Sequence, residues 1–117
     1  MGFFTRNNQF KVEVEFNRIT KEAPLNLEVI LNVSHRGDLH EAINRTDYAL
    51  AGKFRAVNKQ NQEAFNDYLK YFIKKNRGGI VFANEYLIYI LPPKEDLNLP
   101  YKIKPNELLG LFFKIKN

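Results

Sequence analysis

The sequence contains neither cysteine nor tryptophan, and it has no long apolar run. The absence of cysteine excludes disulfides, thiolate zinc sites and cysteine nucleophiles, and it is in keeping with an intracellular protein. The N-terminus has no basic stretch followed by an apolar core, so no signal peptide is predicted. No apolar segment approaches the roughly 20 residues that a membrane helix needs, and we therefore expect no membrane partner.

Motifs of catalysis are also missing. The chain has no glycine-rich phosphate loop, no nucleophile elbow and no prominent pair of carboxylates. His35 and His40 flank Asp38, but their spacing does not place both on one helix face, and no third ligand is evident. The tripeptide Arg36-Gly37-Asp38 indicates a turn. We therefore expect no enzyme, no metal and no cofactor.

What is present is the composition of a folded domain. Of the 117 residues, 44% are hydrophobic, and the chain has 10 Phe and 6 Tyr with which to build a buried core. No repeat, low-complexity tract or linker divides the sequence. We expect a single domain over residues 1–117.

Several segments have the patterns of β-strands. Residues 9–16 and 25–33 alternate between apolar and polar side chains, which is the period of a half-buried strand. A short strand is expected at residues 54–57, and a final strand rich in large apolar residues at 108–115.

Two helices are predicted. Asp38 followed by Glu41 is typical of a helix start, and it predicts a helix within residues 39–53. A longer helix over residues 61–75 has an apolar face that recurs at helical spacing. This face consists of Phe65, Tyr68, Leu69, Phe72 and Ile73.

The long helix leads into a predicted hairpin. Residues 76–79 stop the helix, because glycine adopts a positive φ without steric cost. The hairpin strands are residues 80–82 and 86–91, and Pro92 and Pro93 end the second one. Since strands and helices do not alternate as βαβ units, the predicted class is α+β: a mainly antiparallel sheet curled or closed into a barrel, with about two to three packed helices.

The positive charge is concentrated in one part of the chain. Residues 51–80 hold 7 Lys and Arg against 2 Asp and Glu, which equals the whole net charge of +5. This concentration favours an anionic partner at the long helix. The alternative is a solvated helix face whose cations complement the C-terminal end of the helix dipole.

Tyr71 and Lys75 are the sharpest candidates for a binding site. They are four residues apart on the long helix and therefore share one surface. A phenol beside an ammonium group can donate hydrogen bonds to a phosphate or a carboxylate. The alternative is a tyrosine that lies over lysine side chains with no ligand. Arg77 is expected to order the turn after the helix.

Three blocks, in this order, resemble the SPOC domain family. The first is NRTDYALAGK at residues 44–53, similar to the family's short basic helix with an arginine at its start. The second is FNDYLKYFIKKNRGGIV at residues 65–81, similar to its tyrosine-containing helix and Arg-x-Gly-Val turn. The third joins YLIYILPP at residues 86–93 to LLGLFFK at residues 108–114. The chain lacks the family's opening Trp-x-Gly strand and has fewer residues between its helices, so it resembles a divergent or trimmed member.

The resemblance implies a distorted β-barrel of about seven strands that binds phosphoserine-containing peptides, such as corepressor tails or the tail of RNA polymerase II. It implies a nuclear regulator of transcription, chromatin silencing or RNA processing. Tyr71 and Lys75 match family ligand-binding positions, and Arg45 matches the family arginine that helps form the basic patch. The alternative for Arg45 is a surface ion pair with Asp47 or Glu41. Lys53 or Arg55 would flank the same patch if the two helices are neighbours.

Two other functions stay open. One is a constitutive scaffold in a heterochromatin or RNA-silencing complex, which holds its partner by an apolar surface or an edge strand at residues 9–16 or 108–115, without phosphate recognition. The other is an RNA-binding surface on which Tyr71 stacks against a base.

Overall fold

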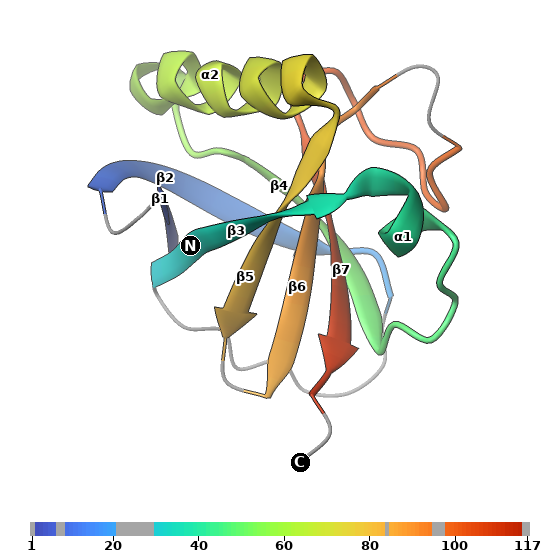
Figure 1. The fold of residues 1–117 in the computed structure, drawn as a ribbon. Helices are drawn as coiled ribbons and strands as arrows, with labels where there is room; N and C mark the ends of the chain where they lie inside the picture. Colours follow the sequence, from blue (N-terminus) through green and yellow to red (C-terminus); the bar gives the residue numbers. More distant parts are fainter. Residues whose placement is uncertain (1, 7–8, 21–29, 84, 95–97, 116–117) are drawn as a thin grey trace.

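The structure is a computed structural model that describes residues 2–6, 9–20, 30–83, 85–94 and 98–115. Seven strands and two helices lie within these residues (Figure 1). In chain order they are β1 (Gly2–Arg6), β2 (Gln9–Arg18), β3 (Ile30–Asp38), α1 (Leu39–Ile43), β4 (Leu50–Ala56), α2 (Lys59–Lys75), β5 (Arg77–Ala83), β6 (Tyr86–Leu91) and β7 (Leu108–Lys114).

The strands close into a barrel in the order β1-β2-β4-β7-β6-β5-β3. Every neighbouring pair is antiparallel except β1 and β3, whose parallel pairing closes the ring. Helix α2 lies across one end of the barrel, and α1 follows β3 on its outer side (Figure 1). The predicted α+β fold with a mainly antiparallel barrel is confirmed.

Closure corrects one prediction about binding. Strand β2 pairs with both β1 and β4, and strand β7 pairs with both β4 and β6. Neither is therefore an edge strand. A partner cannot add a strand at residues 9–16 or 108–115 without displacing a neighbour.

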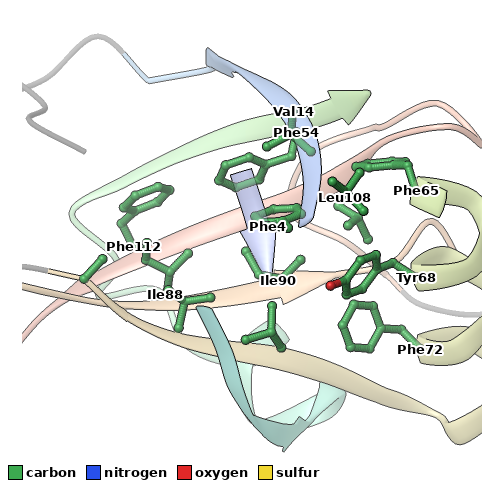
Figure 2. Packing of buried hydrophobic residues seen from close by; sticks show 14 of the residues in the cluster. Phe4, Val14, Phe54, Phe65, Tyr68, Phe72, Ile88, Ile90, Leu108 and Phe112 are labelled. Atoms are coloured by element: carbon green, nitrogen blue, oxygen red, sulfur yellow. The ribbon is translucent and has the colours of Figure 1, made fainter. Parts of the chain in front are cut away.

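The main core fills the barrel interior, and α2 closes it at one end (Figure 2). Phe54 lies between two other rings, with centroids 4.8 Å from Phe4 and 6.5 Å from Phe112. From α2, Phe65 and Phe72 are fully buried in the same core, and Phe72 packs against Tyr68, whose ring meets Phe4. The predicted packing of α2 through its aromatic face is thus confirmed.

A second apolar cluster lies on the outer face of β6 and β7. It is built around Tyr89, Leu111 and Phe113. Leu39 and Ala42 of α1 cover it from one side, and partly buried side chains of residues 99–103 pack against it from the other. The barrel wall is therefore apolar on both faces here, which explains why β6 and β7 are almost continuously hydrophobic.

The first helix is much shorter than predicted. Asp38 caps it as expected, accepting a 2.8 Å hydrogen bond from the His40 amide, but the helix ends at Ile43. Residues 50–53, expected to be helical, begin β4, which pairs with β2 and β7. The pairing on both sides outweighs the local helical signal, because each strand supplies a full row of backbone hydrogen bonds.

Strand β3 also differs from its prediction. It continues to Asp38, five residues beyond the expected end at Val33, while residues 25–29 of the predicted strand lie outside the described residues. The tripeptide at residues 36–38 is therefore strand and not turn. Gly37 is required there, because a Cβ at this position would lie 2.8 Å from the Tyr89 ring.

The end of α2 uses a different residue from the one predicted. Asn76, and not a glycine, adopts the positive φ of 54° that ends the helix. Gly78 and Gly79 are strand residues of β5, where a Cβ on Gly78 would lie 2.9 Å from the Ile90 carbonyl oxygen. Ile73 was expected to face the core, but it is exposed because it lies beyond the edge of the buried face.

Candidate functional site

The C-terminal end of α2 brings two chain segments together. The helix is followed after a single residue by β5, which returns along the barrel antiparallel to β3. In this register Arg36 lies opposite Gly79, and Asp38 lies opposite Arg77. Side chains from α2, β3 and β5 therefore meet at one corner of the barrel.

Tyr71 is tied to this corner by its hydroxyl group. Arg36 Nη1 donates a 3.1 Å hydrogen bond to Tyr71 Oη. The half-buried Tyr71 ring also packs edge-on against Phe72, with centroids 5.7 Å apart. The prediction that Tyr71 lies at the edge of the helix face agrees with this half-buried position, and its hydroxyl group contacts the cationic Arg36 of β3.

A hollow of about 520 Å³ opens at the same corner, and four basic side chains line it: His35, Arg36, Lys75 and Arg77. Its volume lies in the ordinary range of ligand sites, about 300–1,000 Å³. Arg36, Lys75 and Arg77 are cationic side chains, and none of the lining residues is acidic. Such a lining suits an anion with several oxygens, because ammonium and guanidinium groups form charge-assisted hydrogen bonds to them.

His35 forms one wall of this hollow. Ser34 Oγ lies 2.9 Å from His35 Nδ1, within hydrogen-bond distance. On its other side the imidazole meets the Phe82 ring edge-on, with centroids 5.9 Å apart. Both contacts fix the orientation of the ring in the hollow.

The structure places Arg45 in a different setting. Its guanidinium group forms two hydrogen bonds with the Asp47 carboxylate, from Nη2 at 2.6 Å and from Nε at 2.9 Å. The same group lies 4.0 Å from the centroid of the Phe113 ring, on the outer apolar cluster. The hydrogen bond to Asp47 is the main cause that raises the pKa of Arg45 above its ordinary value. Arg45 follows α1 and is not among the residues that line the hollow.

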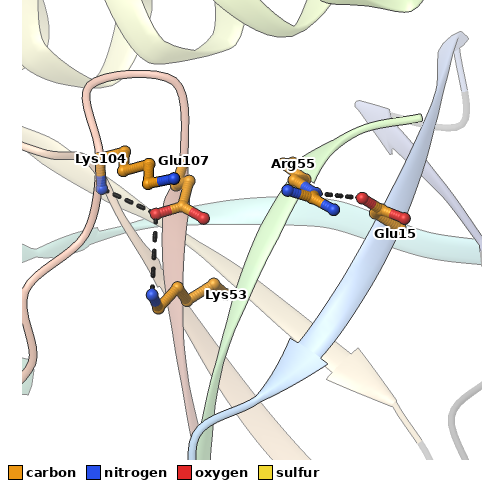
Figure 3. Close-up of polar contacts among 5 residues, drawn as sticks. All are labelled: Glu15, Lys53, Arg55, Lys104 and Glu107. Carbon is orange, nitrogen blue, oxygen red and sulfur yellow. Dashed lines mark hydrogen bonds and ion pairs between the residues drawn. The ribbon is translucent and has the colours of Figure 1, made fainter. Parts of the chain in front are cut away.

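Lys53 and Arg55 lie on β4, and each has a carboxylate partner (Figure 3). Lys53 Nζ lies 4.0 Å from Glu107 Oε1, an oxygen that also accepts a 2.7 Å hydrogen bond from the Lys104 amide. Arg55 pairs with Glu15 of β2. In the closed order, β4 is three places from both β5 and β3, the largest separation possible in seven strands. Neither Lys53 nor Arg55 is among the residues that line the hollow beside Lys75.

The sequence missed three lining residues. His35 was considered only as a metal ligand, Arg36 was assigned to a turn, and Arg77 was given a structural role. The available signal was the apolar alternation of β3, which breaks at a register shift between Val33 and His35 and so hides the continuation of the strand. Only the pairing of β3 with β5 shows that Arg36 reaches the end of α2.

The structure is thus a closed barrel with a basic hollow at one corner. The model of the SPOC domain family matches residues 1–115, and the chain belongs to this family. SPOC domains are non-catalytic protein-interaction modules of transcription and chromatin regulators.

One solved structure that the fold resembles is the crystal structure of the SPOC domain of human PHD-finger protein 3 (PHF3). The TM-score is 0.74 at 17% sequence identity, and the match covers 99% of this chain and 95% of that one. No curated protein matches the sequence. In the described part of the chain, neither helix is long and apolar enough to span a bilayer.

Proposed function

We propose that this domain is an interaction module of a nuclear regulator of transcription, chromatin silencing or RNA processing, and that it binds an acidic peptide through the basic corner. The preferred ligand is a serine-phosphorylated segment of a partner protein. The binding group consists of Arg36, Lys75 and Arg77, with Tyr71 and His35 beside them. The domain acts by binding alone and carries out no catalysis.

The observation that carries this proposal is that the side chains that line the hollow are all basic. Asp38 lies opposite Arg77, but its carboxylate accepts a hydrogen bond from the His40 amide of α1. Within the described residues, the ion pairs are those of Arg45, Lys53 and Arg55, and none involves Arg36, Lys75 or Arg77. A phosphate group brings three acceptor oxygens and about −1.5 to −2 charges at pH 7. Several unneutralised cations that converge on one hollow supply the matching donors.

The family resemblance supports the ligand class, because Tyr71 and Lys75 match its ligand-binding positions. The scaffold alternative loses its strand-addition route, since β2 and β7 are paired on both sides. It keeps only an apolar surface as a means of binding. RNA is less favoured, because a nucleic-acid strand needs a row of cations along a groove, whereas these converge at one corner.

The test is a fluorescence-anisotropy titration of paired peptides that differ only in phosphorylation of one serine. We expect the phosphorylated form to bind more tightly, and Lys75→Ala to remove about ten- to hundredfold of its affinity. Lys59→Ala is the matched control. Lys59 is an exposed lysine at the other end of α2, about 24 Å away at 1.5 Å per residue, and its loss should leave binding unchanged. Equal binding of both peptide forms would contradict the proposal and favour the scaffold.

A further inference from the structure

Phe82 is the most exposed large apolar side chain in the described part of the chain, with 58% of its surface accessible. Its neighbours on β5, Val81 and Ala83, are buried, so Phe82 points outward from the barrel. Its ring contacts His35, which also lines the basic hollow. A single histidine therefore connects the hollow with an exposed aromatic surface.

A β-bulge sets up this connection. The register of β3 against β5 shifts between Val33 and His35, which places His35 opposite Ile80. Such a shift re-aims the following side chains, because one strand gains a residue that the other lacks. Ser34 Oγ contacts His35 Nδ1, and the imidazole lies nearly perpendicular to the Phe82 ring.

We propose that Phe82 and His35 form an apolar subsite for a second residue of the peptide whose acidic or phosphorylated residue enters the hollow. This inference rests on the proposed function and adds a sequence preference: an aromatic or large aliphatic residue near the anionic one. The ligand gains because the exposed ring leaves water when an apolar side chain covers it, and because aromatic rings pack favourably edge-on.

The geometry limits the spacing of the two peptide residues. Phe82 follows Arg77 by five residues along β5, which is at most about 17 Å at roughly 3.3 Å per residue. An extended peptide covers that distance in about five residues. The apolar residue is therefore expected within five positions of the anionic one.

A nucleobase could also stack on an exposed phenylalanine. The charges around Phe82 favour a peptide instead. The exposed Glu85 follows Phe82 in the turn of the hairpin, and its carboxylate would repel the next phosphate of a nucleic-acid strand. A peptide can place its anionic residue in the hollow and an uncharged residue at Phe82, so Glu85 does not repel it.

The test begins with an oriented peptide library that has a fixed phosphoserine and five degenerate positions on each side, selected on the intact domain. We expect enrichment of aromatic and large aliphatic residues at one or two positions. The selected peptide and its serine-substituted partner are then titrated against Phe82→Ala. The variant should bind the apolar peptide about tenfold more weakly and the serine-substituted peptide unchanged.

Ile115→Ala is the matched control, because Ile115 is also exposed but follows β7, two strands from β5. It should change neither affinity. If phosphoserine dependence is seen without apolar enrichment, and Phe82→Ala binds both peptides like the wild type, the subsite is overturned while the proposed function stands. If no phosphoserine peptide binds, both are overturned. If Phe82→Ala weakens binding of an octauridine probe but of neither peptide, Phe82 serves a nucleobase and the subsite is again overturned.

Discussion

Two groups of cations in this domain differ in what neutralises them. Lys53 and Arg55 on β4 each pair with a carboxylate from elsewhere in the chain, Glu107 and Glu15. At the other side of the barrel, Lys75 and Arg77 line a hollow with no acidic residue. A count of charges along the sequence assigns all four to one basic region, yet only the first pair has carboxylate partners within the described residues.

The difference shows that a segment rich in Lys and Arg does not necessarily form a positively charged surface in the folded domain. Residues 51–80 do contain an excess of Lys and Arg over Asp and Glu. In the folded chain, however, strand pairing brings β4 close to acidic residues that are distant in sequence. At the C-terminal end of α2, β3 contributes Arg36 and His35 to the hollow, and its Asp38, which lies opposite Arg77, caps α1 through the His40 amide. Charge in the folded domain is set by which strands become neighbours.

The largest expected effect tests whether α2 is the support of the hollow. Phe72→Ala removes a ring that is 1% exposed in the core, and it should lower the free energy of unfolding by about 3–5 kcal/mol. Ile73→Ala, the next residue along and 37% exposed, should cost about 0.5 kcal/mol or less. Denaturant unfolding measures both. A cost for Phe72→Ala below about 1 kcal/mol would mean that α2 does not depend on this contact.

The second prediction sets the two groups of cations against each other. Arg36→Ala should weaken binding of a phosphoserine peptide about ten- to hundredfold, or roughly 1.5–3 kcal/mol, since it removes a charged donor from the hollow. Arg45→Ala should change it by less than about threefold, because Arg45 is already paired with Asp47. Calorimetric titration of both variants with the phosphoserine peptide measures the two losses of affinity. A larger loss for Arg45→Ala would show that the family match locates the ligand better than the charge pairing does.

A third change would release a cation from the paired group. Glu107 is only 5% exposed and holds both Lys53 and the Lys104 amide. Glu107→Gln keeps a hydrogen-bond acceptor but removes the charge, and we expect a stability loss on the order of 1 kcal/mol in denaturant unfolding. Phosphopeptide affinity should stay within about twofold, because one released lysine does not build a hollow. A marked gain in affinity would show that pairing alone separates the two groups.

The smallest effect concerns the segment that carries Arg45. Tyr48 donates a 3.2 Å hydrogen bond to Tyr101, and this bond, followed by burial, raises the pKa of Tyr48 to about 12 from an ordinary value of 10.0. Tyr48 therefore keeps its proton to a higher pH in the folded state than in the unfolded state. Its stabilisation is complete below pH 10 and is lost as the pH rises through 12. Thermal unfolding across this range should show the loss, and Tyr48→Phe should reduce it. An unchanged pH dependence in Tyr48→Phe would contradict the assignment.

Local patterns predicted much of the fold, because strand alternation and the apolar face of α2 are direct consequences of burial. They placed β2, β6, β7 and α2 correctly to within a few residues. They failed at residues 50–53, where pairing with two strands decides the structure, and at Asn76, where an asparagine adopts the left-handed conformation assigned to glycine.

Part of the candidate site follows from local sequence for the same reason. Tyr71 and Lys75 share a helix turn, so their proximity follows from sequence spacing. Arg36 lies near them because of the register of β3 against β5. Lys53 and Arg55 lie on β4, which is three places from both β3 and β5 in the barrel. These relations depend on long-range pairing, which no local window contains.

The single residue between α2 and β5 has a consequence for the energetics of binding. Lys75 ends the helix and Arg77 begins the strand, with only Asn76 between them, and the Asn76 side chain accepts a hydrogen bond from Lys94. The backbones of two walls of the hollow are thus joined without a flexible loop. A ligand therefore orders little of the main chain when it binds, and the entropic cost of association falls mainly on the side chains and on the ligand itself. For the proposed peptide ligand, such a joint favours fast, reversible exchange of short segments over slow, induced closure around one partner.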